Sequence, residues 1–309
     1  MESFKSKSEE FPFVSVVVPV FNDEKRIGKC IESLISQSYP KDKYEIIIVD
    51  NNSNDGTVEI VKKYPVKILH ENNIQSSYAA RNLGIKNSKG EIIAFTDSDC
   101  IADKNWILNS ILFFGENKCD LIAGDIKFFY KNEQDIFEIL DSFVHFNQKK
   151  GVLSNKVPTA NLFIKKYVFD KIGFFNSDLK SGADILLTNK AVLAGYNLCF
   201  SLGSIVYHPT RNFKELILKH RRIAYDNIPS RLQQGESVLF IIYSLLVDFL
   251  PQKKFFYKRI RNINYKKNKT FLSIKLFFAN WFIIFITNIY RFVYLKDLLI
   301  KKFKKNEKN

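Results

Sequence analysis

The sequence has few cysteines, and no apolar segment stands at its start. Its four cysteines, Cys30, Cys100, Cys119 and Cys199, are scattered and lack the spacing of metal-binding or redox motifs. We therefore expect four unpaired thiols that act as small apolar side chains in a reducing cytosol. Residues 1–10 are polar and contain no apolar core of a signal peptide, so we expect a cytoplasmic location.

The first 250 residues have almost no net charge, because they contain 31 basic and 30 acidic side chains. Residues 251–309 contain 16 basic and 2 acidic side chains, so nearly the whole net charge of +15 lies there. This distribution argues against an enzyme acting on nucleic acid, because the catalytic part has no basic excess. We divide the chain into a catalytic domain, 11–225, and a basic, hydrophobic helical region, 226–309.

Apolar runs rich in β-branched residues alternate with helical patterns in the first hundred residues. Runs at Val14–Val20, Tyr44–Val49 and Glu91–Thr96 are typical of buried strands, and a short strand is expected near 66–70. Residues 25–38 have apolar side chains at helical spacing. This alternation predicts an α/β fold with a mostly parallel sheet, whose ligands bind at the carboxyl ends of the strands.

Carboxylates follow two of these strands. Asp50 ends one apolar run, and Asp97, Ser98 and Asp99 follow another. Two carboxylates one residue apart suit a hard divalent cation, which prefers oxygen ligands. The same residues are also common in strand-end turns, where they hydrogen-bond their own backbone. A ligand site is favoured because Asp50 and Asp97 would lie on the same edge of the sheet.

Five motifs resemble those of family 2 glycosyltransferases, and they occur in the same order. The motifs are Val16–Asn22, Ile48–Thr57, Ala80–Ile85, Ala94–Cys100 and Gly182–Asp184, within residues 13–211. The resemblance implies the GT-A fold of nucleotide-diphospho-sugar transferases, followed by a C-terminal helical appendage. It also implies an enzyme that transfers a sugar, of hexosyltransferase type.

The resemblance further implies a site for a nucleotide-sugar donor. Its candidate residues are Pro19, Phe21, Asn22, Asp50, Arg81, Asp97 and Ser98. Asp50 would accept a hydrogen bond from the base, and Arg81, after a short helix over 75–80, would face the diphosphate. Asp97 would contact the ribose, or the metal through water. Asp99 would bind Mg²⁺ or Mn²⁺, a cation that stabilises the charge on the leaving group.

Two further residues complete the implied site. Asp184 would be the catalytic base that takes the proton of the acceptor hydroxyl, although it could be merely the N-cap of a helix. The family commonly has Glu before this aspartate, where this chain has Ala183. His208 ends another apolar run, and it would supply a metal ligand or a phosphate contact, or only a structural contact.

These roles predict an inverting, metal-dependent, non-processive glycosyltransferase. We expect a non-processive enzyme because the Gln-x-x-Arg-Trp motif of processive polysaccharide synthases is absent from the sequence. A catalytically inactive, membrane-bound scaffold with the same fold is the alternative, although the four site aspartates are present. A sugar-nucleotide nucleotidyltransferase would need a Gly-rich loop after its first strand, where this chain has Phe21, Asn22 and Asp23.

The C-terminal region contains an apolar stretch, 276–295, that is long enough to span a bilayer as a helix. On a helical wheel, Ser273, Asn280, Thr287 and Arg291 form a narrow polar stripe. A largely apolar helix with such a stripe predicts a helix that lies in the plane of a membrane. A spanning helix, or a helical subdomain that packs on the core or on a second subunit, is the alternative.

Lysine pairs flank this stretch, at 253–254, 266–267, 301–302 and 304–305. They would be drawn to the anionic lipids of a cytoplasmic leaflet. We therefore expect a peripheral or monotopic protein on the cytoplasmic face of the cell membrane. This C-terminal region is the only basis for our expectation about the acceptor, which would be a lipid-linked glycan or a growing surface polysaccharide.

Overall fold

A computed structural model describes residues 11–133, 135–144, 147–233, 235–249 and 269–306. The chain divides into two compact units. The first unit consists of residues 1–129 and 146–209, and the second of residues 130–145 and 210–309. The boundary expected after residue 225 falls inside helix α9 (Phe213–Gln233) of the second unit. Residues 1–10 and the lysine pairs at 253–254 and 266–267 lie outside the described residues.

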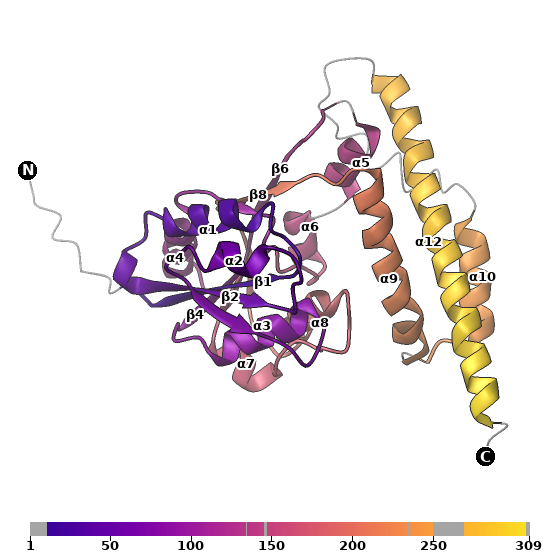
Figure 1. The fold of residues 1–309 in the computed structure, drawn as a ribbon, viewed down its shortest axis with the longest axis horizontal. Helices are drawn as coiled ribbons and strands as arrows, with labels where there is room; N and C mark the ends of the chain where they lie inside the picture. The colour runs from indigo at the N-terminus through magenta and orange to yellow at the C-terminus, as the bar shows by residue number, and fades with distance from the viewer. Residues whose placement is uncertain (1–10, 134, 145–146, 234, 250–268, 307–309) are drawn as a thin grey trace, which may run out of the picture. The chain divides into compact units, whose positions relative to one another are not determined.

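An eight-stranded sheet forms the centre of the first unit (Figure 1). Its strands are β1 (Val14–Val20), β2 (Tyr44–Asp50), β3 (Lys67–His70), β4 (Ile92–Thr96), β5 (Ile101–Ala102), β6 (Leu121–Phe129), β7 (Asn161–Lys165) and β8 (Leu198–Pro209). Their order across the sheet is β3-β2-β1-β4-β7-β6-β8-β5. Strands β1, β2, β3 and β4 pair in parallel, as do β6 and β8, whereas β7 is antiparallel to both neighbours. The predicted α/β fold with a mostly parallel sheet is confirmed.

Both faces of this sheet are buried, because successive side chains of a strand point to opposite faces. In β4, Ile92 and Ala94 belong to one apolar cluster, and Ile93 and Phe95 belong to the other. Helices α1 and α4 contribute to the first cluster, and α3, α7 and α8 to the second. The continuous apolar runs of the central strands follow from this two-sided cover.

The helices of the first unit connect the strands. They are α1 (Ile27–Ile35), the 3₁₀ turn η1 (Lys41–Lys43), α2 (Thr57–Val61), α3 (Ser77–Lys86), α4 (Trp106–Glu116), α6 (Gln148–Leu153), α7 (Tyr167–Ile172) and α8 (Ala183–Leu193). Helix α1 confirms the helix expected over 25–38, although it is shorter at both ends.

Helix α3 corrects the short helix expected over 75–80, because it continues to Lys86 and therefore contains Arg81. Ser76 caps its start by accepting a hydrogen bond from the backbone N–H of Tyr78. Gly84 lies inside this helix, where the absence of a side chain allows the helix to pack closely on the sheet. A Cβ at this position would stand 2.4 Å from Cγ1 of Val17 in β1.

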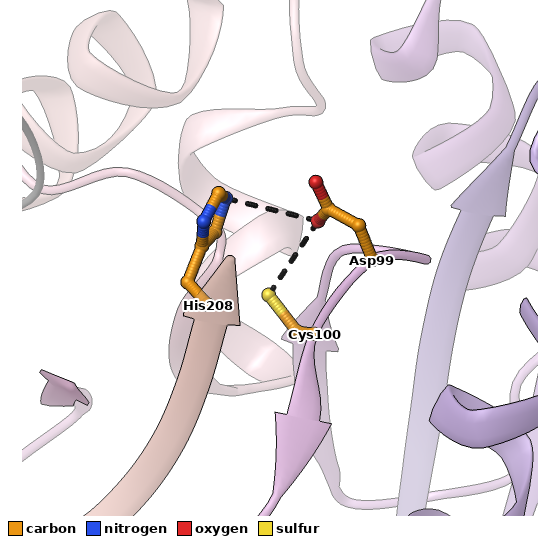
Figure 2. Close-up of side chains that lie close together, drawn as sticks. All are labelled: Asp99, Cys100 and His208. Atoms are coloured by element: carbon orange, nitrogen blue, oxygen red, sulfur yellow. Dashed lines mark hydrogen bonds and ion pairs between the residues drawn. The ribbon is translucent and has the colours of Figure 1, made fainter. Parts of the chain in front are cut away.

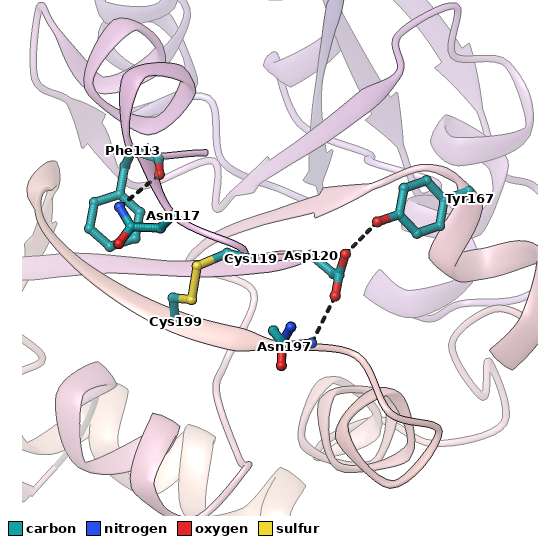
Figure 3. Close-up of a disulfide and its surroundings, with 7 residues drawn as sticks. All are labelled: Phe113, Asn117, Cys119, Asp120, Tyr167, Asn197 and Cys199. Atoms are coloured by element: carbon teal, nitrogen blue, oxygen red, sulfur yellow. Dashed lines mark hydrogen bonds between the residues drawn. A yellow bond between two sulfur atoms is a disulfide. The ribbon is translucent and has the colours of Figure 1, made fainter. Parts of the chain in front are cut away.

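Two of the cysteines form a disulfide, which corrects the expectation of four unpaired thiols. Cys119, just before β6, and Cys199, in β8, are bonded across the pair of parallel strands (Figure 3). No local pattern pointed to this pair, because 80 residues separate the two positions. Cys30 and Cys100 are free and buried.

The second unit is helical (Figure 1). Its described helices are α5 (Ile136–Val144), α9, α10 (Val238–Asp248) and α12 (Lys269–Asn306). Within α12, the segment Phe271–Ile300 is long and apolar enough to cross a membrane, by length and composition only. The most apolar part of that segment is only 28% buried, whereas the core helix of a soluble protein would be mostly buried.

The polar stripe expected on α12 faces the inside of the second unit in its central part. Thr287 is buried and hydrogen-bonds to Nδ1 of His220 in α9, at 2.9 Å. Asn288 is also buried and accepts a hydrogen bond from Arg291. The opposite side of α12 exposes large apolar side chains, namely Phe271, Ile274, Phe278, Phe282, Ile289, Val293 and Ile300. In its central part, this helix thus buries two polar side chains together with Leu276, Ile283 and Leu295, and it exposes large apolar side chains on the other side.

Candidate active site

The carboxyl ends of three parallel strands carry the candidate donor residues. Asp50 is the last residue of β2 and pairs in register with Val20, the last residue of β1. Its buried carboxylate accepts a hydrogen bond from the backbone N–H of Ser53 and lies 3.4 Å from Nδ1 of His70, at the end of β3. The strands thus bring Asp50 to the edge at which a parallel sheet binds ligands.

The three candidate residues at the end of β1 and just after it differ in exposure. Pro19 is buried within β1, beyond the last residue that this strand pairs with β4, whereas Phe21 and Asn22 are exposed. Asn22 has a positive φ of 49°, and its side chain accepts a hydrogen bond from the N–H of Asn54 in the loop after β2. Phe21 and Asn22 are therefore accessible to a ligand from solvent, whereas Pro19 is not.

Arg81 and Asp97 form an ion pair. Nη2 of Arg81 lies 2.6 Å from Oδ1 of Asp97, which follows β4. Arg81 is almost fully buried on α3, and its Cζ lies 5.6 Å from the centre of the Tyr78 ring. The arginine that the sequence placed toward the diphosphate is thus held by the first aspartate of the Asp-Ser-Asp motif.

Asp99 lies beside His208, as Figure 2 shows. Nε2 of His208 stands 3.7 Å from Oδ1 of Asp99. The fold creates this contact through the antiparallel pair of β5 and β8, in which Ile101 lies opposite Tyr207. In this antiparallel register, Cys100, just before Ile101, comes opposite His208, just after Tyr207.

The donor atoms of Asp99, Cys100 and His208 lie within 4.8 Å of one another, and they form a possible metal site. Nδ1 of His208 lies 2.6 Å from the carbonyl oxygen of Pro209, which can only accept a hydrogen bond. This contact places a proton on Nδ1, so Nε2, which faces Asp99, is the nitrogen that can bind a cation. A carboxylate oxygen and a neutral imidazole nitrogen fit a divalent cation.

Cys100 fits this cation less well. Burial, together with the negative charge of Asp99 and Asp97, raises the pKa of the Cys100 thiol well above its usual value. The thiol therefore stays protonated, and Sγ donates a weak hydrogen bond to Oδ1 of Asp99 at 3.7 Å. A hard divalent cation also prefers oxygen ligands to a soft sulfur ligand, so the oxygen and nitrogen donors carry the fit.

Asp184 lies in the first turn of α8, where Gly182, and not Asp184, is the N-cap residue. Its carboxylate is buried and accepts three hydrogen bonds. The donors are the hydroxyl of Tyr78 at 3.0 Å, the N–H of Ile185 at 3.0 Å and the N–H of Thr159 at 3.2 Å. These bonds hold the carboxylate in one orientation, as a general base requires.

Tyr78 connects Arg81 with Asp184, and sequence reasoning missed it. Its ring lies against Arg81, its hydroxyl donates to Asp184, and the hydroxyl oxygen accepts from the N–H of Gly182. Burial and the charge of Asp184 raise the pKa of Tyr78, so the phenol remains a donor. The signal available in the sequence was the spacing of Tyr78 and Arg81, three residues apart on one helix face.

Ser98 contacts another residue that the sequence did not place in the site. Its hydroxyl donates to Oδ2 of the buried Asp23 at 2.6 Å. Oδ1 of Asp23 accepts from Nε of Arg26 at 2.5 Å. Burial raises the pKa of Asp23, while the hydrogen bonds from Ser98 and Arg26 oppose that rise. The loop after β1 is thereby tied to the Asp-Ser-Asp motif.

Comparisons of the sequence identify a family. The sequence model described as glycosyl transferase family 2 matches residues 15–172. Glycosyltransferase AglE of Haloferax volcanii is 38% identical over 250 residues, which are 78% of this chain and 82% of that relative. The chain is also 29% identical to the poly(ribitol-phosphate) beta-glucosyltransferase of Bacillus spizizenii and 28% identical to the poly(ribitol-phosphate) beta-N-acetylglucosaminyltransferase TarS of Staphylococcus aureus, of whose length it spans only 34% and 35%.

Two solved structures are similar to this chain. S. aureus TarS 1–349 in complex with UDP-GlcNAc is 27% identical, with a TM-score of 0.53, over 69% of this chain and 66% of that chain. Mannosyltransferase PcManGT from Pyrobaculum calidifontis, in complex with GDP-Man and Mn²⁺, is 17% identical, with a TM-score of 0.59, over 90% of this chain and 87% of that chain. The second likeness concerns the fold alone. The predicted GT-A fold is confirmed, and the chain belongs to glycosyl transferase family 2 and is a glycosyltransferase.

Proposed function

We propose that this glycosyltransferase is inverting, metal-dependent and non-processive, and that it transfers one sugar from a nucleoside-diphosphate donor to an acceptor hydroxyl. The observation that carries the proposal is the proximity of Asp99 to Nε2 of His208, next to the pair of Arg81 and Asp97. The similar structures bound to UDP-GlcNAc and to GDP-Man with Mn²⁺ support a donor of this class.

Asp99 and His208 would hold Mg²⁺ or Mn²⁺. When bound, the cation stabilises the negative charge that builds on the diphosphate as it leaves. Asp50, at the end of β2, would accept a hydrogen bond from the base, and Phe21 and Asn22 would contact the nucleotide from the loop after β1. Arg81 would keep Asp97 in place for a contact with the ribose.

Asp184 would remove the proton from the acceptor. As the acceptor oxygen forms its bond to the anomeric carbon, the bond from that carbon to the diphosphate oxygen breaks, and the hydroxyl proton passes to Asp184. In-line attack of this kind inverts the configuration of the carbon. Oδ1 accepts from the Tyr78 hydroxyl and the N–H of Ile185, and Oδ2 accepts from the N–H of Thr159, so Oδ2 would be the oxygen that receives the proton.

The donor site can be tested by thermal stabilisation. We would measure the melting temperature with UDP, GDP, CMP and dTDP, each with and without Mn²⁺, for the wild type and for Asp99→Asn. We expect one nucleotide to raise the melting temperature in a Mn²⁺-dependent way, and the variant to lose that effect. The preferred nucleotide would also name the base of the donor.

A control variant makes this test decisive. Asp103→Asn removes a carboxylate beyond β5, outside the proposed site, and should keep the shift. If no nucleotide stabilises a wild-type protein that is demonstrably folded, the proposed donor site is wrong. Asp99→Asn with a full Mn²⁺-dependent shift would contradict the role of Asp99 as a metal ligand.

A second observation favours an acceptor at a membrane. In the second unit, α12 exposes the seven apolar side chains named above, and α10 exposes Leu239, Phe240, Tyr243, Leu246 and Val247. We define these twelve side chains as the apolar surface of the second unit. Such a surface is costly in water and favourable in lipid, where polar groups belong on the inside of the helices. We infer a peripheral or monotopic protein on the cytoplasmic face, attracted to anionic lipid, with a lipid-linked glycan or surface polysaccharide as acceptor.

The two tryptophans allow a test of this membrane contact. Trp281 lies on α12, whereas Trp106 is fully buried in the first unit. We expect anionic vesicles that contain brominated phospholipid to bind the protein and to quench its fluorescence, and Trp281→Phe to remove the quenching without affecting binding. Failure of the protein to float with these vesicles would contradict the inference, and a lipid-independent dimer would assign the apolar surface to a second copy.

A further inference from the structure

Arg26 stands beside Asp99, the proposed metal ligand. Its Nη1 lies 3.6 Å from Oδ2 of Asp99, and its side chain is 42% exposed. The other oxygen of the same carboxylate, Oδ1, lies 3.7 Å from Nε2 of His208. The two oxygens of Asp99 thus approach a permanent cation and an imidazole nitrogen.

The contact of Arg26 is built into the fold. Its Nε donates to Asp23, which is buried and also accepts from Ser98 in the loop of Asp99. The N–H of Asp23 donates to Oγ1 of Thr57 at 2.8 Å, and its carbonyl accepts from the N–H of Arg26 at 3.1 Å. Asp23 therefore holds the guanidinium at Asp99 from a fixed backbone.

A guanidinium at this place has two electrostatic consequences. It stays protonated at physiological pH, so it repels a divalent cation that binds the same carboxylate. A donor diphosphate brings several negative charges to the same edge of the sheet, and arginine binds phosphate oxygens well. Because the side chain is partly exposed and long, it can exchange one anion for the other.

We propose that Arg26 is a built-in counter-ion of Asp99, which competes with the divalent cation when no donor is present and pairs with the donor diphosphate when cation and donor bind together. The proposal rests on the proposed metal site of Asp99 and His208. It makes the cation bind weakly alone and tightly with the nucleotide. The coupling is reciprocal, so the nucleotide also binds more tightly when the cation is present.

The experiment measures the binding of Mn²⁺ alone, from the paramagnetic resonance of the free ion. We expect Arg26→Gln to bind Mn²⁺ roughly five- to tenfold more tightly than the wild type, at the low end of the Coulomb range for a partly exposed pair. Lys25→Gln removes the same charge from the neighbouring exposed residue, and it should change the affinity by less than about twofold because solvent screens it. Arg26→Lys keeps the charge and should bind Mn²⁺ like the wild type.

The second measurement uses UDP and GDP at saturating Mn²⁺, by calorimetry. The substitution should have the opposite effect on nucleotide affinity: Arg26→Gln should bind the preferred nucleotide about tenfold more weakly than the wild type, because one charged contact to phosphate is lost. Lys25→Gln should bind it like the wild type. If the glutamine variant melts early, Arg26→Met, which is of similar length and uncharged, takes its place.

Several results would overturn the proposal. It is wrong if Arg26→Gln binds Mn²⁺ alone no better than Lys25→Gln, or if it binds the nucleotide as tightly as the wild type. Asp99→Asn separates this failure from that of the metal site. If Asp99→Asn loses Mn²⁺ while the Arg26 variants are unchanged, the metal site stands and the counter-ion does not. If Asp99→Asn binds Mn²⁺ normally, the metal site itself fails.

Discussion

Replacing Asp184 by asparagine separates its structural role from its proposed chemical role. The carboxylate accepts hydrogen bonds from Tyr78, Ile185 and Thr159. An asparagine must turn its NH₂ group toward one of these donors. The least costly orientation keeps the oxygen toward Tyr78 and Ile185 and loses the bond from Thr159. A lost bond at a buried site costs about 1–3 kcal/mol of stability.

The effect on activity should be much larger. Removing a positioned general base lowers the rate by about 10²- to 10⁴-fold. We would measure the turnover of the donor that gives a thermal shift, with and without an acceptor preparation, together with the melting temperature. Asp170→Asn is the matched control, because Asp170 is an exposed carboxylate of α7 in the same unit, and it should leave both quantities nearly unchanged.

One result would refute this reasoning directly. If Asp184→Asn retains more than about a tenth of the wild-type rate, the loss is too small for the general base of the reaction. If it loses activity only because it no longer folds, Tyr78→Phe provides a second probe. That variant keeps the carboxylate and removes one of its three hydrogen bonds, so it should lower the rate while leaving activity measurable.

The remaining predictions concern packing and the cysteines. Gly84→Ala should destabilise the first unit by about 1–3 kcal/mol, because the added Cβ would overlap Val17. Gly115→Ala should be neutral or up to about 1 kcal/mol stabilising, because the added Cβ would meet no atom within 4 Å. Urea denaturation compares the stability of the two variants. Denatured, unreduced protein should contain two reactive thiols, Cys30 and Cys100, and four after reduction; four thiols without reductant would contradict the disulfide. Reducing a bond that closes a loop of 80 residues should cost about 4 kcal/mol or less.

The sequence by itself determined the α/β sheet and the edge at which its acidic residues stand. Runs such as Val14–Val20 specify buried strands through local composition, and a residue after a strand necessarily lies at the end of that strand. For this reason Asp50, Asp97 and Asp99 could be assigned to one edge of the sheet before any contact was known. The helical character of the C-terminal stretch was equally local, and α12 (Lys269–Asn306) includes all of 276–295.

The tertiary structure decided which distant residues meet. His208 reaches Asp99 only because β8 pairs with the two-residue strand β5, which is too short to leave a pattern in the sequence. Tyr78 reaches Asp184 because α3 packs against the sheet beside α8, and Cys119 reaches Cys199 because β6 and β8 are neighbours. The polar stripe of α12 likewise faces inward because α9 offers His220 as a partner to Thr287. Such contacts depend on which surfaces pack together, and local spacing along the chain carries no information about that.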